Sequence, residues 1–408
     1  MRYPNLLKDQ MAGLEDLLFK ASAEELDERG CLSTEVCKEI DRRALKWAEA
    51  KLKGFYMPIE VGHGSDPNNK WRTASCLQKA IRGGDPEMAM FAVSALFDMD
   101  ASYALRRLGT IAVEDVLIGN LPVVMATLAA MGDVKWRKAV DERRLLIWLA
   151  KELASGAKDR ASVSLIVGST MTSQTLLDGC CKMTNEQLAE ILDDAESPDL
   201  AKQVAALAMA GTKRFPVDGM SETNDRPATA LFKFMADDSM CKALLWLAAR
   251  TASRLHDAMF ATLLMVDRWL RADKTMQEIE SDVGPRPKVG LLLGAAYDRY
   301  TREGQAAISK FFRDCPALKP FVEATPGHHP QREMAFRAVF LAEGGVLNRR
   351  AAYGGGRSEI VYGLVNDPVN RFSHLPPELS AQLLTTVRAN LGFLNECRSK
   401  VLYAKLKK

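Results

Sequence analysis

The sequence predicts an all-α fold in which two or three helical subdomains pack together with little or no β-structure. A chain of 408 residues is too long for one small core. Its hydrophobic fraction of 47% and charged fraction of 26% are ordinary for a globular protein. Its apolar residues recur mainly at three- and four-residue spacing between helix start and stop signals, which indicates amphipathic helices.

The clearest predicted helix begins after Ser33, a residue type that caps helices, and ends at Gly54. Its apolar residues form one stripe that should face the core: Val36, Ile40, Ala44, Trp47 and Ala48. Thr184 and Gln187 have the spacing of a capping box and predict a second helix start.

Later segments give weaker signals. Pro198 predicts the start of a helix that Gly211 ends. The stretch Lys242–Met276 predicts one or two long helices, and its apolar residues cover more than one face, so we expect it to be central to the fold. The run Ile360–Tyr362 is the clearest β signal, but it is too short to distinguish a strand from a turn or a helix end.

Loops rich in Gly, Pro, Asn, Asp or His divide the chain. They are predicted at Pro58–Asn69, Asp218–Pro227, Gly284–Lys288, Thr325–Pro330, Gly344–Gly356 and Ser373–Pro377. We expect four parts: an N-terminal helical segment (1–66), a helical domain (67–190), a second helical domain (191–320), and a basic C-terminal region with a Gly-rich loop and a terminal helix (321–408).

The compartment is inferred from missing signals. The first residues lack the basic and then apolar layout of a signal peptide. The most apolar stretches, such as Leu117–Met131, are interrupted by Gly, Pro, Arg or His, so no membrane contact is predicted. Eight cysteines without a CxxC motif are expected to be reduced structural thiols. We therefore expect a cytoplasmic protein of a bacterial or phage-infected host cell.

Motifs for catalysis are absent from the sequence, including the P-loop, the dinucleotide-binding glycine motif, HExxH and the GxSxG elbow. Adjacent carboxylates such as Glu114 and Asp115 point in different directions on an α-helix and make poor acid–base pairs. The pair His328 and His329 could take a metal or a phosphate, but a solvated loop is the simpler interpretation. We predict a non-enzymatic protein with no cofactor and no metal.

The net charge of +3 is unevenly distributed along the chain. Residues 1–66 carry ten Lys or Arg against thirteen Asp or Glu, whereas residues 349–408 carry ten against four. The C-terminal end is therefore where a polyanion would dock most favourably, although a merely solvated basic end fits the pattern equally well.

The stretch from Ser75 to Val124 predicts a helix, an Arg-Gly-Gly-Asp-Pro turn, a second helix, a short turn at Asp98–Asp100 and a long helix. Asp85 can cap the helix whose first residue is Pro86. Two arginines precede two carboxylates here by about two helical turns, which is too far for direct pairing. We therefore expect a polar network with neighbouring helices that involves Arg106, Arg107, Glu114 and Asp115.

This pattern resembles the C-terminal region of the RarA (MgsA) family of replication-associated AAA+ ATPases. In that family an Arg-Gly-Ser-Asp-Pro turn precedes a helix, a Tyr, an Arg-Arg-Leu and an Ala-Ser-Glu-Asp-Ile-Gly run. The matching positions are Arg82, Gly83, Asp85, Pro86, Tyr103, Arg106, Arg107, Leu108, Ala112, Glu114, Asp115 and Val116. The run Ala157–Ala161 is similar to the family's Pro-Lys-Ser-x-Ala turn. The resemblance covers roughly residues 70–170, about a quarter of the chain.

The resemblance implies that residues 67–190 form a collar-like helical module without its motor. The Walker motifs are missing, only about 70 residues stand where the family's ATPase core should precede this region, and Leu117 replaces the family's glycine. In the family this region supports oligomerisation beside a DNA-handling enzyme. The resemblance therefore implies work on DNA and a homo-oligomer.

Runs that interleave cations and aromatic residues predict contacts with single strands, because cations bind phosphates and flat side chains stack on bases. Lys70-Trp71-Arg72 is one such run. The best is Asn348–Arg357, whose three consecutive glycines cannot hold a helix cheaply, so we expect a mobile basic loop. A terminal amphipathic helix repeats the mixture. The predicted contact residues are Arg349, Arg350, Tyr353, Arg357, Arg398, Lys400, Lys405, Lys407, Lys408, Lys135 and Arg137.

These features together predict a single-stranded-DNA-binding accessory protein of replication, recombination or transcription. Its role would resemble that of the phage-encoded, single-stranded-DNA-binding RNA polymerase cofactors of N4-like phages, with a polymerase as protein partner. The alternative is a protein–protein adaptor or inhibitor that docks on a replication machine without nucleic acid. An enzyme with an unfamiliar helical site would be favoured by a bound metal or cofactor.

Overall fold

The computed structural model describes residues 3–57, 69–171, 174–217 and 222–406. It is 71% helical and 5% strand, which confirms the all-α class. The first helices are α1 (Asn5–Gln10), α2 (Thr34–Lys53), α3 (Lys70–Arg82), α4 (Pro86–Ile111), α5 (Leu121–Gly132), α6 (Val134–Ala139), α7 (Glu142–Ser155), α8 (Ala161–Thr170), α9 (Gln174–Lys182), α10 (Asn185–Asp193), α11 (Asp199–Ala210), α12 (Thr229–Asp237), α13 (Lys242–Arg250) and α14 (Leu263–Ala272).

The strands and the C-terminal helices complete the described chain. They are β1 (Met276–Glu280), β2 (Lys288–Val289), β3 (Leu292–Leu293), α15 (Arg302–Asp314), α16 (Lys319–Ala324), α17 (His328–Val339), β4 (Arg349–Tyr353), α18 (Arg357–Asn366), α19 (Pro368–Arg371), α20 (Pro377–Ala389) and α21 (Leu391–Leu406). Short helical turns connect them: η1 (Glu15–Leu18), η2 (Ala23–Glu25), η3 (Ala112–Val116), η4 (Leu117–Asn120), η5 (Thr251–Leu255), η6 (Ala258–Thr262), η7 (Gly294–Ala296), η8 (Pro316–Leu318) and η9 (Phe340–Gly344).

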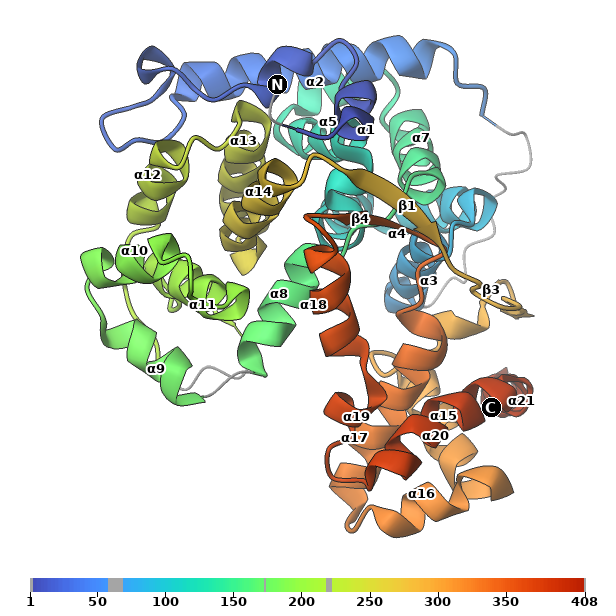
Figure 1. Cartoon of the computed structure of the whole chain (residues 1–408). Helices are drawn as coiled ribbons and strands as arrows, with labels where there is room; N and C mark the ends of the chain where they lie inside the picture. Colours follow the sequence, from blue (N-terminus) through green and yellow to red (C-terminus); the bar gives the residue numbers. More distant parts are fainter. Residues whose placement is uncertain (1–2, 58–68, 172–173, 218–221, 407–408) are drawn as a thin grey trace.

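The buried hydrophobic residues form two cores. The larger core lies in the main body, by which we mean residues 3–297 and 349–366, and the smaller one in the C-terminal lobe, residues 302–344 and 368–406. Figure 1 shows the lobe below the main body, with α18 running from one to the other. The residues of the second core begin at Ala307, which lies inside the predicted part 191–320. The division of the chain into four parts stays a prediction.

Local capping signals begin helices where the sequence predicts them. The Ser33 hydroxyl accepts the backbone N–H of Val36 at 3.3 Å, and α2 ends at Gly54. Thr184 and Gln187 form the predicted capping box of α10. The Asp85 carboxylate likewise accepts the N–H of Met88 at 2.9 Å in the first turn of α4. These contacts are short-range, which is why sequence spacing alone locates them.

Two expectations about helices and loops are wrong. For a third segment the sequence left a strand, a turn and a helix end open, and the structure decides between them. The stretch Lys242–Met276 is not one or two long helices, because a π turn (η5) and a left-handed His256 with φ +54° interrupt it between α13 and α14. His328 and His329 do not lie in a loop but open α17, directly after Gly327. The run Ile360–Tyr362 is helical and belongs to α18.

The glycine-rich segment is not a mobile loop, contrary to the sequence expectation. Arg349–Tyr353 form strand β4, which pairs antiparallel with β1. On its other edge the N–H of Ala351 donates to the Lys158 carbonyl, and the N–H of Lys158 donates to the Arg349 carbonyl, both at 2.8 Å. The three glycines follow the strand with positive φ and turn the chain into α18. Backbone pairing on both edges thus fixes the residues that the composition placed on a loop.

A buried polar network joins α3 to the π turn η3 and to the segment before α8. Asp115 is fully buried, and its carboxylate accepts hydrogen bonds from Arg82 Nε at 2.7 Å and Gln78 Nε2 at 2.8 Å. Arg160 Nε lies 3.1 Å from the same carboxylate. Burial alone would raise the pKa of Asp115, but Arg82 and Arg160 lower it overall. The expected network therefore exists for Asp115, and Arg107 joins it through Gln78.

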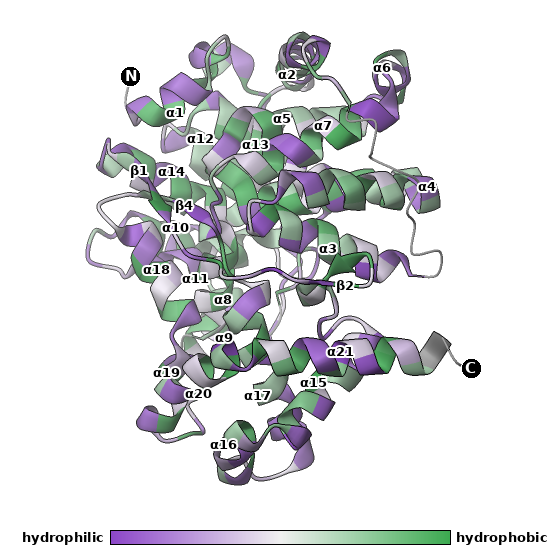
Figure 2. Cartoon of the chain, turned by 90° about the vertical axis from the view of Figure 1, so that its right-hand side faces the viewer, coloured by the Kyte–Doolittle hydropathy of each residue, from purple (hydrophilic) through white to green (hydrophobic). Residues whose placement is uncertain are grey.

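One stretch, Pro86–Gly132, is long and apolar enough to cross a membrane, which the sequence expectation did not allow for. It comprises α4, α5 and the turns between them, and 89% of its most apolar part is buried inside the fold. Figure 2 shows hydrophobic residues along these helices, which pack among their neighbours. Such burial is typical of the core helices of a soluble protein.

Replacing Asp115 with Ala should destabilise the main body strongly. The change removes the buried carboxylate that Arg82 and Arg160 share, and breaking a buried ion pair in this way costs about 3–5 kcal/mol. Urea denaturation should show this loss. Asp237→Ala is the matched control, because its pair with Lys233 at 2.7 Å is exposed and exposed pairs contribute about 1 kcal/mol or less. Equal effects of the two changes would contradict a central role for the network.

Candidate nucleic-acid interface

Tyr353, the predicted base-stacking residue, is buried. Only 2% of its surface is exposed, its ring packs against Trp269 with centroids 6.3 Å apart, and its hydroxyl donates to Asp159 Oδ2 at 3.1 Å. Burial and the neighbouring Asp159 carboxylate raise its pKa well above the ordinary value. The expectation that Tyr353 stacks on a base is therefore wrong, because the ring forms part of the core.

The arginines around Tyr353 already have acidic partners. Arg349 lies 3.1 Å from the Glu278 carboxylate, and Arg350 Nη2 lies 2.6 Å from Glu359 Oε2. Arg357 is half-exposed, and its nearest carboxylate, that of Asp199, is 3.9 Å away. A phosphate would have to compete with a carboxylate at the first two positions. Of these arginines, Arg357 has the most accessible charge.

Two further predicted contact residues are buried within ion pairs, so their assignment to a surface is corrected. Arg398 is 1% exposed and bonds the Glu343 carboxylate. Arg137 lies 2.6 Å from Glu142 Oε1 and donates to the carbonyl of Ala130 near the end of α5. Both arginines link helices to each other and do not reach a ligand.

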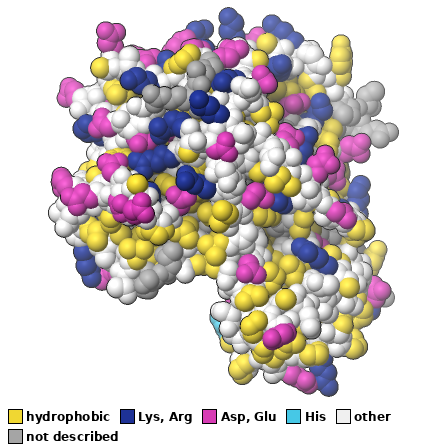
Figure 3. Space-filling model, in the orientation of Figure 1, with side chains coloured by type: hydrophobic (Ala, Val, Ile, Leu, Met, Phe, Trp, Pro, Cys, Tyr) yellow, Lys and Arg dark blue, Asp and Glu magenta, His cyan; other side chains and the backbone are white. Residues whose placement is uncertain are grey.

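Of the remaining predicted residues, the two whose side chains the structure describes lie on different helices and do not share one surface. Lys135 is exposed on α6, and Lys400 is exposed on α21, 3.8 Å from Glu396. Figure 2 shows α6 at the top of the molecule and α21 in its lower half. Lys405 lies in α21, where only its backbone is described, and Lys407 and Lys408 lie outside the described residues. On the face in Figure 3, several Lys and Arg side chains lie close together on the upper left, with Asp and Glu among and around them.

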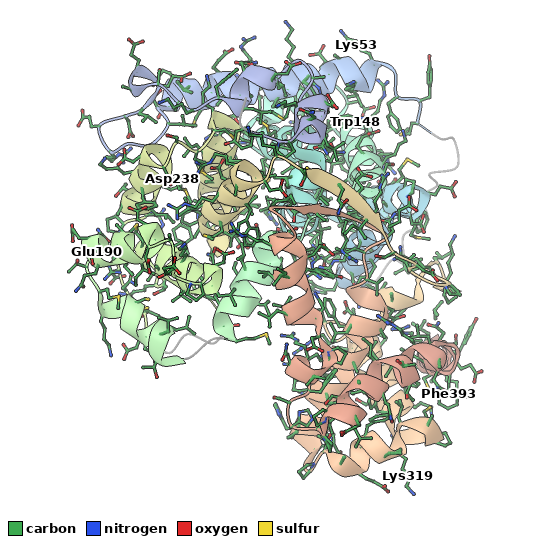
Figure 4. All side chains as sticks on the ribbon, in the orientation of Figure 1. Lys53, Trp148, Glu190, Asp238, Lys319 and Phe393 are labelled. Carbon is green, nitrogen blue, oxygen red and sulfur yellow. The ribbon has the colours of Figure 1, made fainter. Side chains whose placement is uncertain are left out.

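A different constellation brings aromatic and cationic side chains together. We call it the aromatic cleft, a pocket of 450 Å³ between the end of α2, α4, α5 and α7. It is lined by Trp47, Lys51, Gly54, Phe55, Tyr56, Met90, Asn120, Val123, Trp148, Lys151 and Glu152. Figure 4 labels Trp148 on α7, below Lys53 at the outer end of α2.

The path of the chain after α2 shapes this cleft. The helix ends at Gly54, and Arg144 of α7 donates to the carbonyls of Leu52 at 2.8 Å and Phe55 at 2.7 Å. These bonds satisfy carbonyls that a helix end leaves open and fix the end of α2 against α7. Phe55 is thereby buried, whereas Tyr56 projects with 89% of its surface exposed.

Lysine ammonium groups lie beside two of the aromatic rings of the cleft. Trp47 and Trp148 pack with ring centroids 6.2 Å apart. Lys51 Nζ lies 5.8 Å from the Trp47 ring, and Lys151 Nζ lies 5.6 Å from the Phe55 ring. The only carboxylate among the lining residues is that of Glu152, 3.4 Å from Lys151 Nζ. Rings and ammonium groups in one concave site suit a ligand that is both flat and anionic.

Trp71 and Tyr103 form a second aromatic pair, of which Trp71 is exposed. Their ring centroids are 5.7 Å apart, 59% of Trp71 is exposed, and Lys70 Nζ lies 5.0 Å from the Tyr103 ring. The Asp100 carboxylate 3.6 Å from Lys70 offsets that positive charge. The run Lys70-Trp71 is therefore on the surface, outside the aromatic cleft.

No family model, curated protein or solved structure matches this chain. The resemblance to the RarA collar region therefore stays a prediction. Within the described ranges, no three His, Cys, Asp or Glu side chains gather in an arrangement that could hold a metal ion. All eight cysteines are free thiols.

Replacing Asp159 with Asn should make stability less dependent on pH between about pH 4 and 7. Burial raises the pKa of the Asp159 carboxyl from 3.8 to about 7. The stability gained from its bound proton is fully present below the unfolded pKa and is lost as the pH rises through about 7. Asn keeps an oxygen acceptor for Tyr353 and has no proton to lose. In thermal melts, the variant's Tm minus that of the unmodified protein should be larger at pH 7 than at pH 5. A constant difference would contradict the raised pKa.

Proposed function

We propose that the protein binds single-stranded DNA and that the aromatic cleft holds its bases. The observation that carries the proposal is that one cleft brings together two lysines, the exposed Tyr56 and the partly buried Trp47, and that the buried rings of Phe55 and Trp148 line the same cleft. Stacking on aromatic rings contributes about 1–3 kcal/mol per base and tolerates any sequence, while ammonium groups bind the phosphates. Tyr56 at the cleft is almost fully exposed and needs no rearrangement to stack on a base.

The proposed biological role rests on the resemblance to the RarA collar region. Leu117 has a φ of +39°, in the left-handed region that favours glycine, at the position where that family has glycine. This backbone geometry is consistent with the resemblance and supports a role in replication, recombination or transcription. Recruitment of a polymerase, self-association through the collar-like region, and a phage or bacterial setting belong to the same proposal.

Replacing Tyr56 with Ala should lower the affinity for a labelled oligothymidylate at least about fivefold, the lower end of a stacking contribution. Fluorescence anisotropy measures this affinity. Because Tyr56 is exposed, the change should leave the fold intact, which thermal melting verifies. Tyr300→Ala is the matched control, since Tyr300 is also exposed and beside an arginine but lies outside the cleft. Equal affinities of both variants and the unmodified protein would refute the cleft assignment.

Replacing Lys51 and Lys151 together with Ala should reduce the salt dependence of binding. Each phosphate contact with a single strand contributes about 0.7 to the slope of log affinity against log salt, so the slope should fall by about 1.4. Titrations at several salt concentrations measure it. An unchanged slope would show that the two lysines do not contact phosphates. Binding of a protein partner that survives nuclease treatment, with no oligonucleotide binding at micromolar protein, would favour the adaptor alternative instead.

A further inference from the structure

Four arginines line the junction between the main body and the C-terminal lobe. Arg82 and Arg160 belong to the main body and share the Asp115 carboxylate. Their guanidinium carbons lie 5.6 Å and 5.7 Å from the ring of Phe340, which opens η9 at the edge of the lobe. Arg337 of α17 and Arg371 at the end of α19 belong to the lobe. Arg337 precedes Phe340 by one helical turn, so arginines from both units lie near this ring.

The two arginines of the lobe differ from those of the main body because they lack acidic partners. Among the described residues, no carboxylate lies within ion-pair distance of Arg337 or Arg371. Arg337 donates to the Arg371 carbonyl at 2.9 Å, which caps the end of α19 and gives the Arg337 guanidinium a structural role. This bond uses only the backbone of Arg371. The Arg371 guanidinium has a weaker partner, because its Nη1 faces the weakly accepting sulfur of Met171 at 3.8 Å.

The guanidinium group of Arg371 is held in an unfavourable setting. Its Nε is buried and has no hydrogen-bond partner in the described structure. Burial, together with the nearby charges of Arg337 and Arg160, lowers its pKa to about 10. The pKa of His374, three residues later, is also lowered by its partial burial and by the charge of Arg337. A partly buried cation without a counter-charge costs free energy, so this cluster lacks an anion.

We propose that a phosphate group binds between Arg160, Arg337 and Arg371. Guanidinium groups present planar forks of N–H donors, which match the oxygens of a phosphate better than a lysine ammonium does. The bound phosphate supplies the charge that Arg371 lacks and links the lobe to the main body. It comes either from a terminal phosphate, such as inorganic phosphate or a nucleotide end, or from the backbone of a nucleic acid. The site is separate from the aromatic cleft and does not depend on the proposed function.

The test compares Arg371→Gln with the unmodified protein by thermal melting, with and without 10 mM inorganic phosphate at constant ionic strength set by chloride. Phosphate should raise the Tm of the unmodified protein by at least about 2 °C and that of the variant by less than half as much. Without phosphate the variant should be as stable as the unmodified protein or more so, because the unpaired charge is gone. Arg388→Gln is the control, since Arg388 is an exposed arginine of the same lobe, and it should keep the phosphate response.

Two oligonucleotides, with and without a 5′-phosphate, distinguish the sources. A rise in Tm with inorganic phosphate, or only with the 5′-phosphorylated strand, supports a terminal phosphate. An equal rise in Tm with both strands, removed by Arg371→Gln, supports a phosphate of the nucleic-acid backbone. The Tyr56→Ala variant separates this site from the cleft, because it should keep the phosphate response while losing oligonucleotide affinity. The proposal is overturned if none of the three probes stabilises the protein. It is equally overturned if Arg371→Gln shows the same rise in Tm on adding phosphate as the unmodified protein, whether or not the variant is less stable without phosphate.

Discussion

The Asp115 carboxylate is the group on which the arrangement of the central segments depends. It has no contact with solvent and binds side chains from α3 and from the segment before α8. Its own carbonyl accepts the N–H of Asp159 at 3.0 Å, which fixes the same segment through the backbone. Lys158, one residue earlier, pairs with β4, and β4 leads directly into α18 and the C-terminal lobe. The contacts of Asp115 thus connect α3 to the segment before α8, and through Lys158 and β4 to α18 and the C-terminal lobe.

Local signals predicted much of the helical structure, because a capping side chain acts on a backbone group two or three residues away. Ser33, Asp85 and Thr184 are examples. The polar network around Asp115 was also expected, although the sequence could not show that a π turn carries it. That wider turn brings Glu114 and Asp115 together on Arg82, whereas neighbouring side chains on an α-helix diverge.

The site could not be predicted in the same way. Trp47 was recognised as part of an apolar stripe, which fits its partial burial, but its partner Trp148 lies about a hundred residues away. Only tertiary packing brings the two rings and the two lysines together. The glycine run misled for a related reason, since three glycines permit a tight turn after a strand as readily as a mobile loop. The partner strand β1 lies some seventy residues earlier in the chain.

Counting charges along the sequence also overestimates how basic the C-terminal region is in space. Arg349 and Arg398 contribute to the excess of cations there, yet their carboxylate partners, Glu278 and Glu343, lie before residue 349. A net charge of +3 gives the whole molecule little long-range attraction for a polyanion. The proposed binding of anions therefore requires places where some positive charge lacks a nearby carboxylate. The aromatic cleft, with two lysines and one carboxylate, is one such place, and the junction at Arg371 is another.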